Sequence, residues 1–363
     1  MTFAGLPLAW LHDLSPWVFR MPGSSFGVRW YGLSYVLGFL AAWWLVRWAA
    51  ARGWTPIPKW AAIDVILWAA GGAIVGGRLF YCVLYQPLLL WTFEPSFPFW
   101  GGLMINRGGM ASHGGMVGVC VAAWRISRGF RTADGELQGR CPPMHVMELF
   151  ALVAGPGLLF GRLANFINGE LLGRVVAGPG ESAPAWAVRF PQEHLTNHAA
   201  ELNVAQSAQL VDLVRIYAPN AERFGEGYAR VVELLQAGGV DAPQIERALT
   251  PLVSARHPSQ LYQALAEGVV TTLVVWWLWR KPRRLGVVGG AWLVTYGVLR
   301  IATEFARLPD DHLAVARFAG FSRGQWLSGM MIAVGVAVFV IGPKLSRERF
   351  GGWGRAGVQS PAA

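Results

Sequence analysis

The chain has 363 residues, of which 54% are hydrophobic and only 14% are charged. About a quarter of the residues of a soluble domain are usually charged, so this composition excludes an ordinary soluble domain and predicts a membrane protein. The formal net charge of +10 at pH 7 could suggest nucleic-acid binding. The basic residues, however, cluster after alternate apolar segments, which is the positive-inside pattern of membrane topology. We therefore expect no nucleic acid among the partners.

Apolar windows of about 20 residues, enough to cross a bilayer as a helix, recur along the chain. Basic clusters after the first, third, fifth and last windows place those loops in the cytoplasm. The predicted fold is an all-α polytopic membrane protein with an extracytoplasmic N-terminus, a cytoplasmic C-terminus and no signal peptide. The seven predicted transmembrane helices lie at about 26–50, 60–85, 110–127, 145–166, 259–279, 286–305 and 325–343.

A long polar stretch separates the fourth and fifth predicted spans and is expected to form an extracytoplasmic head segment. Gly and Pro dominate residues 175–191, which indicates a loop, whereas residues 197–253 are typical of two or three amphipathic helices. The expected parts are an N-terminal extracytoplasmic segment (1–25), spans one to four (26–166), the head segment (167–258), spans five to seven (259–343) and a cytoplasmic, disordered tail (344–363).

Neither the cysteines nor the histidines indicate a metal. The three cysteines, Cys82, Cys120 and Cys141, have no metal-type spacing and no plausible disulfide partner, so we interpret them as small buried apolar residues. The seven histidines lack a pattern such as H-E-x-x-H, and the Gly-rich stretches lack the P-loop lysine. No metal and no cofactor are expected.

Polar side chains recur near the predicted outer ends of five spans. Ionisable groups at such a depth are costly and indicate a functional site by default. The spacing i, i+4, i+8 places the three from the sixth span on one helix face, so we predict a polar pocket near the outer leaflet. The residues are Arg29 and Tyr31, Arg78 and Tyr81, His113, Arg162 and Asn165, and Tyr296, Arg300 and Glu304.

Three arginines around one pocket, Arg78, Arg162 and Arg300, predict an anionic ligand with several acceptor oxygens. Arginine suits this role because its planar guanidinium binds phosphate through two hydrogen bonds and stays charged when desolvated. A phospholipid head group is the anion most readily available at this depth of a bilayer.

Structural interpretations compete with this one. Arg300 and Glu304 could form only an intrahelical ion pair, since they are four residues apart. Arg78 could extend along its stem to the interface, and His113, beside two glycines, could mark a tight helix start. Residues with independent structural roles would scatter in depth, so their common depth favours a site.

Four further polar residues also have structural interpretations. Asn165 and Asn168 could cap the end of the fourth span. Glu148, in the fourth span, and Glu267, in the fifth, are each isolated among apolar neighbours. We interpret both glutamates as helix-packing residues.

The run from Gly161 to Gly173, GRLANFINGELLG, resembles the signature of the prolipoprotein diacylglyceryl transferases. The resemblance covers roughly 26–191 and 257–343. It implies an enzyme of the bacterial cytoplasmic (inner) membrane that moves the diacylglyceryl group of phosphatidylglycerol to the lipobox cysteine of prolipoprotein signal peptides, releasing glycerol phosphate. Supporting motifs follow in the family's order: RWYGL at 29–33, GGRLFY at 76–81, HGG at 113–115, PAWAVRFP at 184–191, HPSQLY at 257–262 and Y-x-x-x-R-x-x-x-E at 296–304.

The same resemblance implies roles for individual residues. Arg162 and Arg300 would clamp the lipid phosphate, and either His113 or Tyr296 would activate the incoming thiol. Glu304 would orient Arg300. Together with Arg78 and Asn168, which are added for their position and chemistry, the residues expected to bind phosphatidylglycerol are Tyr31, Arg162, Asn165, Glu170, Gly173, Arg300 and Glu304.

Three features depart from the family pattern, and one other class of function competes. Ala164 stands where many members have glycine, Glu148 stands where an aspartate is expected, and residues 192–256 look longer than the usual outer domain. The alternative function is a membrane transporter or binding protein for an anionic lipid or solute. Transporter sites usually lie at the bilayer midplane between internal repeats, whereas here the polar residues cluster toward one face and no repeat is visible.

Overall fold

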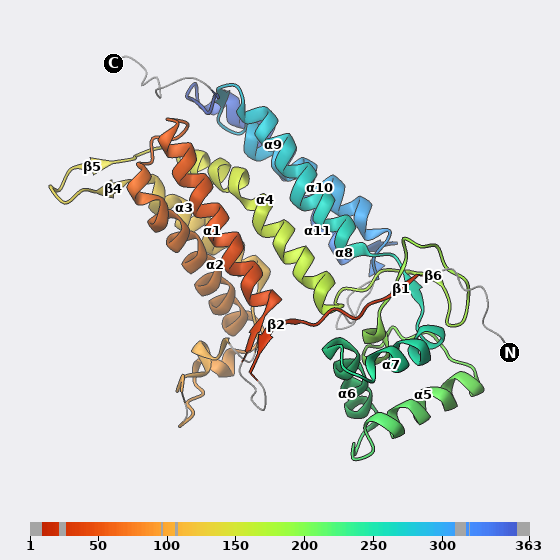
Figure 1. The fold of residues 1–363 in the computed structure, drawn as a ribbon. Coiled ribbons are helices and arrows are strands. Elements are labelled where there is room, and N and C mark those ends of the chain that lie inside the picture. Colours follow the sequence, from red (N-terminus) through yellow and green to blue (C-terminus); the bar gives the residue numbers. More distant parts are fainter. Residues whose placement is uncertain are drawn as a thin grey trace. The chain divides into compact units, whose positions relative to one another are not determined.

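The computed structural model describes residues 9–21, 27–95, 97–105, 108–308, 317–318 and 320–353. It is mostly helical, as expected (Figure 1). Within those ranges, five helical stretches are long and apolar enough to cross a membrane, and each coincides with a predicted span. They are Trp30–Ala51 (α1), Lys59–Leu84 (ending in α2, Ala62–Leu84), Pro143–Asn168 (α4), Ser259–Trp279 (α8, a π-helical segment and α9) and Gly324–Leu345 (within α11, Arg323–Leu345).

Two further helices coincide with the third and sixth predicted spans. They are α3 (Ser112–Ser127) and α10 (Val287–Glu304). Neither is among the five stretches that meet the length and composition of a span. With 16 residues, α3 is short for a bilayer, and α10 carries Arg300 and Glu304 in its last turns.

The chain divides into two compact units. The first comprises Met1–Gly38, Gly157–Val270 and Tyr296–Ile332, and the second comprises Phe39–Pro156, Thr271–Thr295 and Ala333–Ala363. The segment between the fourth and fifth spans therefore belongs to the same unit as the last turns of α4 and α10, which carry most of the predicted site residues.

Three helices of the first unit form a small core of their own, and they lie together in Figure 1. They are α5 (Val204–Tyr217), α6 (Phe224–Ala237) and α7 (Ala242–Leu249), which confirms the amphipathic helices predicted at 197–253. Asn203 begins α5 with a capping box. Its side chain accepts a hydrogen bond from the Gln206 backbone N–H, and the Gln206 side chain accepts one from the Asn203 backbone N–H. Tyr228 lies at the centre of this core, and its hydroxyl donates to the Pro191 carbonyl oxygen at 2.8 Å.

A four-stranded sheet in the first unit was not predicted. Its order is β1 (Trp10–Leu11), β7 (Val188–Arg189), β8 (Ala255–Arg256) and β6 (Val175–Ala177), with β1 and β7 parallel and the other pairs antiparallel. Strands of two or three residues are too short to show the alternation by which a strand is recognised in a sequence. The loop predicted at 175–191 thus contains two strands.

In the second unit, α2 and α3 pack closely through glycines. A Cβ added to Gly72 would lie 2.4 Å from the Gly118 carbonyl oxygen, and one added to Gly76 would lie 2.3 Å from that of Gly114. Small residues permit such close backbone contact between membrane helices. The Glu148 carboxylate of α4 accepts hydrogen bonds from three backbone N–H groups at 286–289, where α10 begins, so its packing role is confirmed.

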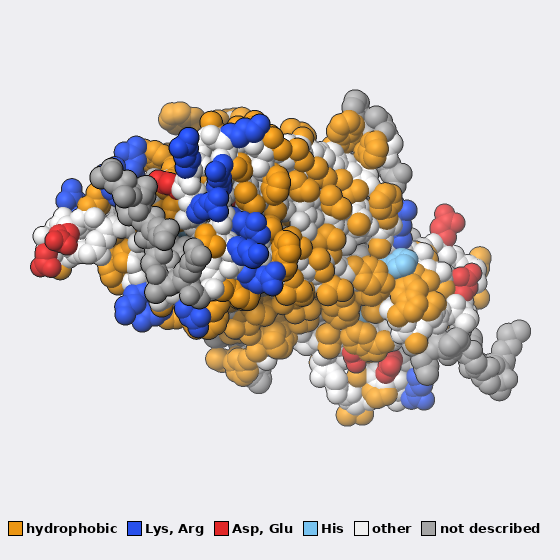
Figure 2. All heavy atoms as spheres, turned by 90° about the horizontal axis from the view of Figure 1, so that it is seen from above, with side chains coloured by type: hydrophobic (Ala, Val, Ile, Leu, Met, Phe, Trp, Pro, Cys, Tyr) orange, Lys and Arg blue, Asp and Glu red, His pale blue; other side chains and the backbone are white. Residues whose placement is uncertain are grey.

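Large apolar side chains are exposed along the candidate spans. On α2 they include Leu67 and Val75, at 62% and 65% exposure. Figure 2 shows hydrophobic side chains spread over much of the visible face. Soluble monomers rarely expose continuous apolar surface on this scale, and a lipid environment accounts for it.

Candidate functional site

The centre of the site is Glu267, a carboxylate with no exposed surface. It lies in the π-helical segment Ala264–Val270, between α8 (Ser259–Gln263) and α9 (Thr271–Trp279). Arg162, in the last turns of α4, donates to Glu267 Oε2 from Nε at 3.0 Å and from Nη2 at 2.8 Å. One edge of the guanidinium is therefore held by a single carboxylate oxygen.

Two residues of α10 reach the same carboxylate. The Tyr296 hydroxyl donates to Glu267 Oε2 at 3.3 Å, and Arg300 Nε lies 3.8 Å from Glu267 Oε1. Arg162 and Arg300, which are 138 positions apart in the sequence, thus flank one buried negative charge. The structure brings together two of the three arginines that the sequence predicted to share a pocket.

Arg300 also pairs with Glu304, as its spacing on α10 predicts. Arg300 Nη1 lies 2.9 Å from Glu304 Oε2, while Glu304 Oε1 accepts from the Ser322 hydroxyl at 3.1 Å. A Cβ added to Gly324 would lie 3.2 Å from Glu304 Oε1, so the start of α11 packs tightly against this carboxylate. The ion pair therefore exists, but it is one part of a larger network.

The π-helical segment that carries Glu267 packs directly against α4. A Cβ added to the following residue, Gly268, would lie 2.9 Å from the Leu159 Cα, so the two backbones touch one helical turn before Arg162. Segments of π-helix are rare and occur frequently at functional sites. Glu267, which looked isolated in the sequence, joins its helix to α4 and α10, because its carboxylate binds Arg162 and lies beside Arg300.

The end of the GRLANFINGELLG motif forms a second polar group. Asn165 and Asn168 donate from Nδ2 to the two carboxylate oxygens of Glu170, each at 3.1 Å. Gly169 and Leu171 have φ values of +66° and +56°, a conformation that is uncommon for a non-glycine residue. The asparagines thus do more than end α4, because they orient an exposed carboxylate.

Gly173 closes the motif at a point where no side chain fits. A Cβ there would lie 2.0 Å from the His257 carbonyl oxygen. The Gly173 carbonyl oxygen accepts from Arg256 Nη1 at 3.1 Å, and Arg256 Nε donates to the buried Glu193 at 2.7 Å. The buried Arg256–Glu193 pair joins the sheet to the motif, and no pattern in the sequence indicated it.

Tyr31 lies in the first turn of α1, in the same unit as the residues above. Its ring packs edge-on against that of Tyr35, with the centroids 5.3 Å apart. Close packing of α1 on α4 occurs one to two turns further along, where a Cβ added to Gly38 would lie 3.2 Å from the Gly157 Cα.

Arg78 and His113 belong to the second unit. The buried Arg78 guanidinium donates four hydrogen bonds of 2.7–2.9 Å to backbone carbonyl oxygens at 101, 102, 108 and 109. It therefore organises the loop before α3 and does not extend outward to the interface. His113, the second residue of α3, is exposed.

Fold and site together define a multi-pass α-helical membrane protein with a buried arginine–carboxylate network that joins three of its helical stretches. A family model described as prolipoprotein diacylglyceryl transferase matches residues 16–341, and the chain belongs to this family.

Three relatives carry the same name, phosphatidylglycerol–prolipoprotein diacylglyceryl transferase. The protein of Bdellovibrio bacteriovorus is 36% identical over 360 residues, covering 95% of this chain and 97% of its own. That of Ralstonia pickettii is 36% identical over 321 residues, covering 86% and 89%. That of Neisseria gonorrhoeae is 34% identical over 320 residues, covering 86% and 91%. The family resemblance inferred from the motifs is confirmed.

Proposed function

We propose that this protein transfers the diacylglyceryl group of phosphatidylglycerol to the thiol of the lipobox cysteine of prolipoproteins, as the names of its relatives indicate. The observation that carries the proposal is the meeting of Arg162 and Arg300 at Glu267 in a member of this family. These names do not favour the alternative of a transporter or binding protein. The protein lies in the bacterial cytoplasmic membrane, with seven spans, its N-terminus outside and its C-terminus inside.

The reaction is an alkyl transfer. The thiolate sulfur attacks the terminal glycerol carbon of the lipid, a C–S bond forms, and the C–O bond to phosphate breaks. The electron pair stays on the phosphate oxygen, so a singly charged phosphodiester leaves as a doubly charged glycerol phosphate. Stabilising this growing charge is the main electrostatic task of the site.

Arg162 and Arg300 clamp the phosphate in this proposal. Glu267 holds Arg162 by its Nε and Nη2 edge, which directs Nη1 away from that carboxylate and toward a ligand. Glu304 faces Arg300 through one ion-pair contact, with Nη1 2.9 Å from Oε2. Arginines held by carboxylates keep one orientation before the lipid arrives, so little of the binding free energy is lost in ordering them.

Other residues have supporting roles. Asn165, Asn168 and Glu170, joined by two hydrogen bonds, offer donors and acceptors to the glycerol hydroxyls of the head group. Gly173 keeps the chain close to His257. Tyr31, in the first turn of α1, contributes to binding the lipid. The four carbonyl contacts of Arg78 support an indirect role, in which it shapes the loop before α3.

Thiol activation has two candidates. A free thiol with a pKa of about 8.5 needs a base to react near neutral pH. His113 is the first candidate because histidine is the side chain that most often acts as a general base. Tyr296 is the second, and its hydroxyl already donates to Glu267.

The direct test uses the purified protein, phosphatidylglycerol and a peptide with a lipobox cysteine. Mass spectrometry should show the peptide gaining one diacylglyceryl group, and a peptide with Ser in place of Cys should gain nothing. Arg162→Ala should abolish the gain while the protein still inserts and purifies. Near-normal lipidation by this variant would remove Arg162 from the mechanism, and no lipidation by the unmodified protein would refute the proposed activity.

A further inference from the structure

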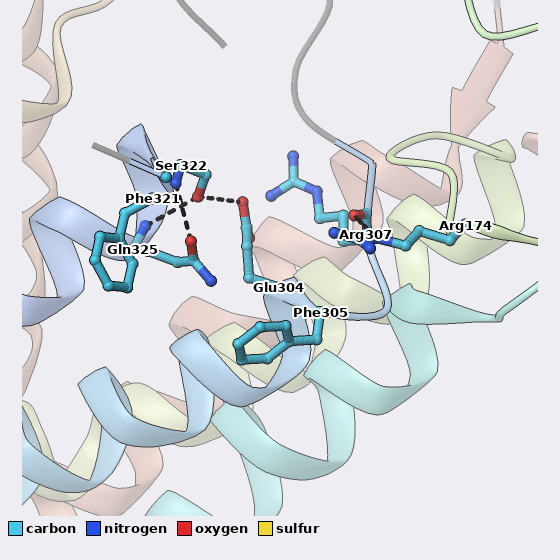
Figure 3. Close-up of a pocket in the computed structure, with 8 residues that line it drawn as sticks. Arg174, Glu304, Phe305, Arg307, Phe321, Ser322 and Gln325 are labelled. Atoms are coloured by element: carbon cyan, nitrogen blue, oxygen red, sulfur yellow. Dashed lines mark hydrogen bonds between the residues drawn. The ribbon is translucent and has the colours of Figure 1, made fainter. Parts of the chain in front are cut away.

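The Glu304 carboxylate contacts the start of α11 as well as Arg300. Its Oε2 lies 2.9 Å from Arg300 Nη1, and its Oε1 accepts a hydrogen bond from the Ser322 hydroxyl at 3.1 Å. Figure 3 shows this hydrogen bond, with Ser322 between Glu304 and Gln325. One carboxylate therefore joins α10 to the residue that precedes α11, and both lie in the first unit.

The position of Ser322 is fixed by backbone contacts on both sides. Its side-chain oxygen accepts from the Gln325 backbone N–H at 3.1 Å, and Gln325 Oε1 accepts from the Ser322 backbone N–H at 2.9 Å. This reciprocal pattern is that of a capping box at the start of α11. Ser322 is also paired with Arg317 in the antiparallel hairpin of β10 (Arg317–Phe318) and β11 (Phe321–Ser322). The buried hydroxyl is therefore held in one place.

The chemistry of the hydroxyl directs its hydrogen to Glu304. A serine hydroxyl has one hydrogen to donate and two lone pairs that accept. Because the Ser322 oxygen accepts from the Gln325 N–H, its own hydrogen remains for Glu304 Oε1. Within the described residues, no other hydrogen bond is donated to this carboxylate. Gly324 packs beside it, since a Cβ added there would lie 3.2 Å from Oε1, so the carboxylate has little room to turn.

We propose that Ser322 is a positioning residue for diacylglyceryl transfer, because its hydroxyl holds Glu304 in the orientation that pairs with Arg300. This inference rests on the proposed function, in which Arg300 clamps the lipid phosphate. Glu304 is the nearer carboxylate of Arg300, at 2.9 Å against 3.8 Å for Glu267. A Glu304 side chain that is free to turn would leave Arg300 less firmly oriented. The effect of Ser322 on the reaction passes through Glu304 and Arg300.

Lipidation kinetics of the full-length, detergent-solubilised protein test the proposal. Ser322→Ala should lower kcat about tenfold with little change in KM for phosphatidylglycerol, because Arg300 keeps its charge but loses its fixed orientation. Ser322→Thr keeps a hydroxyl and should retain most of the rate. Ser328→Ala is the matched control, because Ser328 is a buried serine of α11 whose hydroxyl donates to the Gly324 carbonyl oxygen within its own helix. It should keep a normal kcat.

Two further variants separate the hydrogen bond to Glu304 from the capping of α11. Gln325→Ala removes half of the capping box but leaves the Ser322 hydroxyl, so it should lower the unfolding temperature and keep kcat near normal. Ser322→Asp keeps a side chain that caps a helix well, but it replaces the donor to Glu304 with a second negative charge. It should fold and lose more activity than Ser322→Ala, and it decides the question if Ser322→Ala does not fold.

The remaining outcomes would overturn the proposal. Normal kcat in Ser322→Ala or in Ser322→Asp would show that the hydroxyl does not position the site. An equal loss of kcat in Gln325→Ala would assign the effect to the start of the helix. A raised KM with unchanged kcat in Ser322→Ala would assign Ser322 to ground-state binding of the lipid. Absence of lipidation by the unmodified protein would instead refute the proposed function.

Discussion

Glu267 offers the sharpest test of how the site is organised. Glu267→Gln removes a buried charge that two donors of Arg162 and the Tyr296 hydroxyl contact directly. Breaking a buried ion pair by neutralising one partner costs about 3–5 kcal/mol. Because the Arg162 side chain keeps 18% exposure, we expect a loss of stability near the lower end, about 3 kcal/mol.

Activity should fall for a separate reason, the lost orientation of the arginines. Without the carboxylate charge, the guanidinium groups still attract phosphate but lose their fixed orientation, and a misplacement of about 1 Å can cost about 100-fold in rate. Glu267→Gln should therefore lower kcat about 100-fold without raising KM for phosphatidylglycerol. Glu267→Asp keeps the charge but withdraws it by about 1.5 Å, beyond hydrogen-bonding reach of Arg162, and should show a similar loss.

The assay combines peptide lipidation followed by mass spectrometry with thermal unfolding in the same detergent. Glu148→Gln is the matched control, because Glu148 is also a buried glutamate but binds only backbone N–H groups at the start of α10. It should lower the unfolding temperature and leave kcat unchanged below that temperature. A Glu267→Gln protein with normal kcat would refute the view that this carboxylate positions the arginines.

Three further predictions concern separate parts of the chain. Arg300→Lys should lose most of its kcat/KM in the lipidation assay, because a point charge cannot reproduce the guanidinium fork; full activity would mean that charge alone is needed. Gly173→Ala should be inactive or unfolded, since its Cβ would lie 2.0 Å from the His257 carbonyl oxygen, whereas Gly225→Ala, with nothing within 4 Å, should unfold at or above the original temperature. Burial lowers the pKa of His12 from 6.5 to about 4. Between these two pH values the unfolded state binds a proton that the folded state does not. The free energy of unfolding should therefore fall as the pH drops from about 6.5 to about 4, by at most about 3 kcal/mol. His12→Phe should flatten that part of the pH profile, and an unchanged profile in thermal unfolding would contradict the assignment.

Local patterns in the sequence predicted much of this architecture. Apolar length located the five helical stretches that meet the criteria of a span, and amphipathic periodicity located α5, α6 and α7. The i, i+4, i+8 spacing correctly placed Tyr296, Arg300 and Glu304 on one face of α10, as their contacts show. These features depend only on residues that are neighbours within one helix, so the spacing of residues along the sequence is enough to predict them.

Tertiary contacts account for what the sequence did not reveal. Glu267 looked isolated because its partners lie on other helices. It also lies in a π-helical segment, which no local sequence pattern predicts. No pattern around Arg78 indicated that its guanidinium donates to backbone carbonyl oxygens of the loop before α3. The hydrogen bond from the Arg174 side chain to the Arg307 carbonyl oxygen depends on a β-bridge between segments more than 130 residues apart.

A double-mutant cycle on Arg162 and Arg300 tests the central claim most directly. Lysine replaces each arginine singly and then both together, and lipidation rates are measured at saturating peptide. If both guanidinium groups bind one lipid phosphate, the second substitution should cost far less than it does alone, because residues that act as a unit are not additive. Losses that simply add would mean that the two arginines act at separate places and would contradict the shared phosphate clamp.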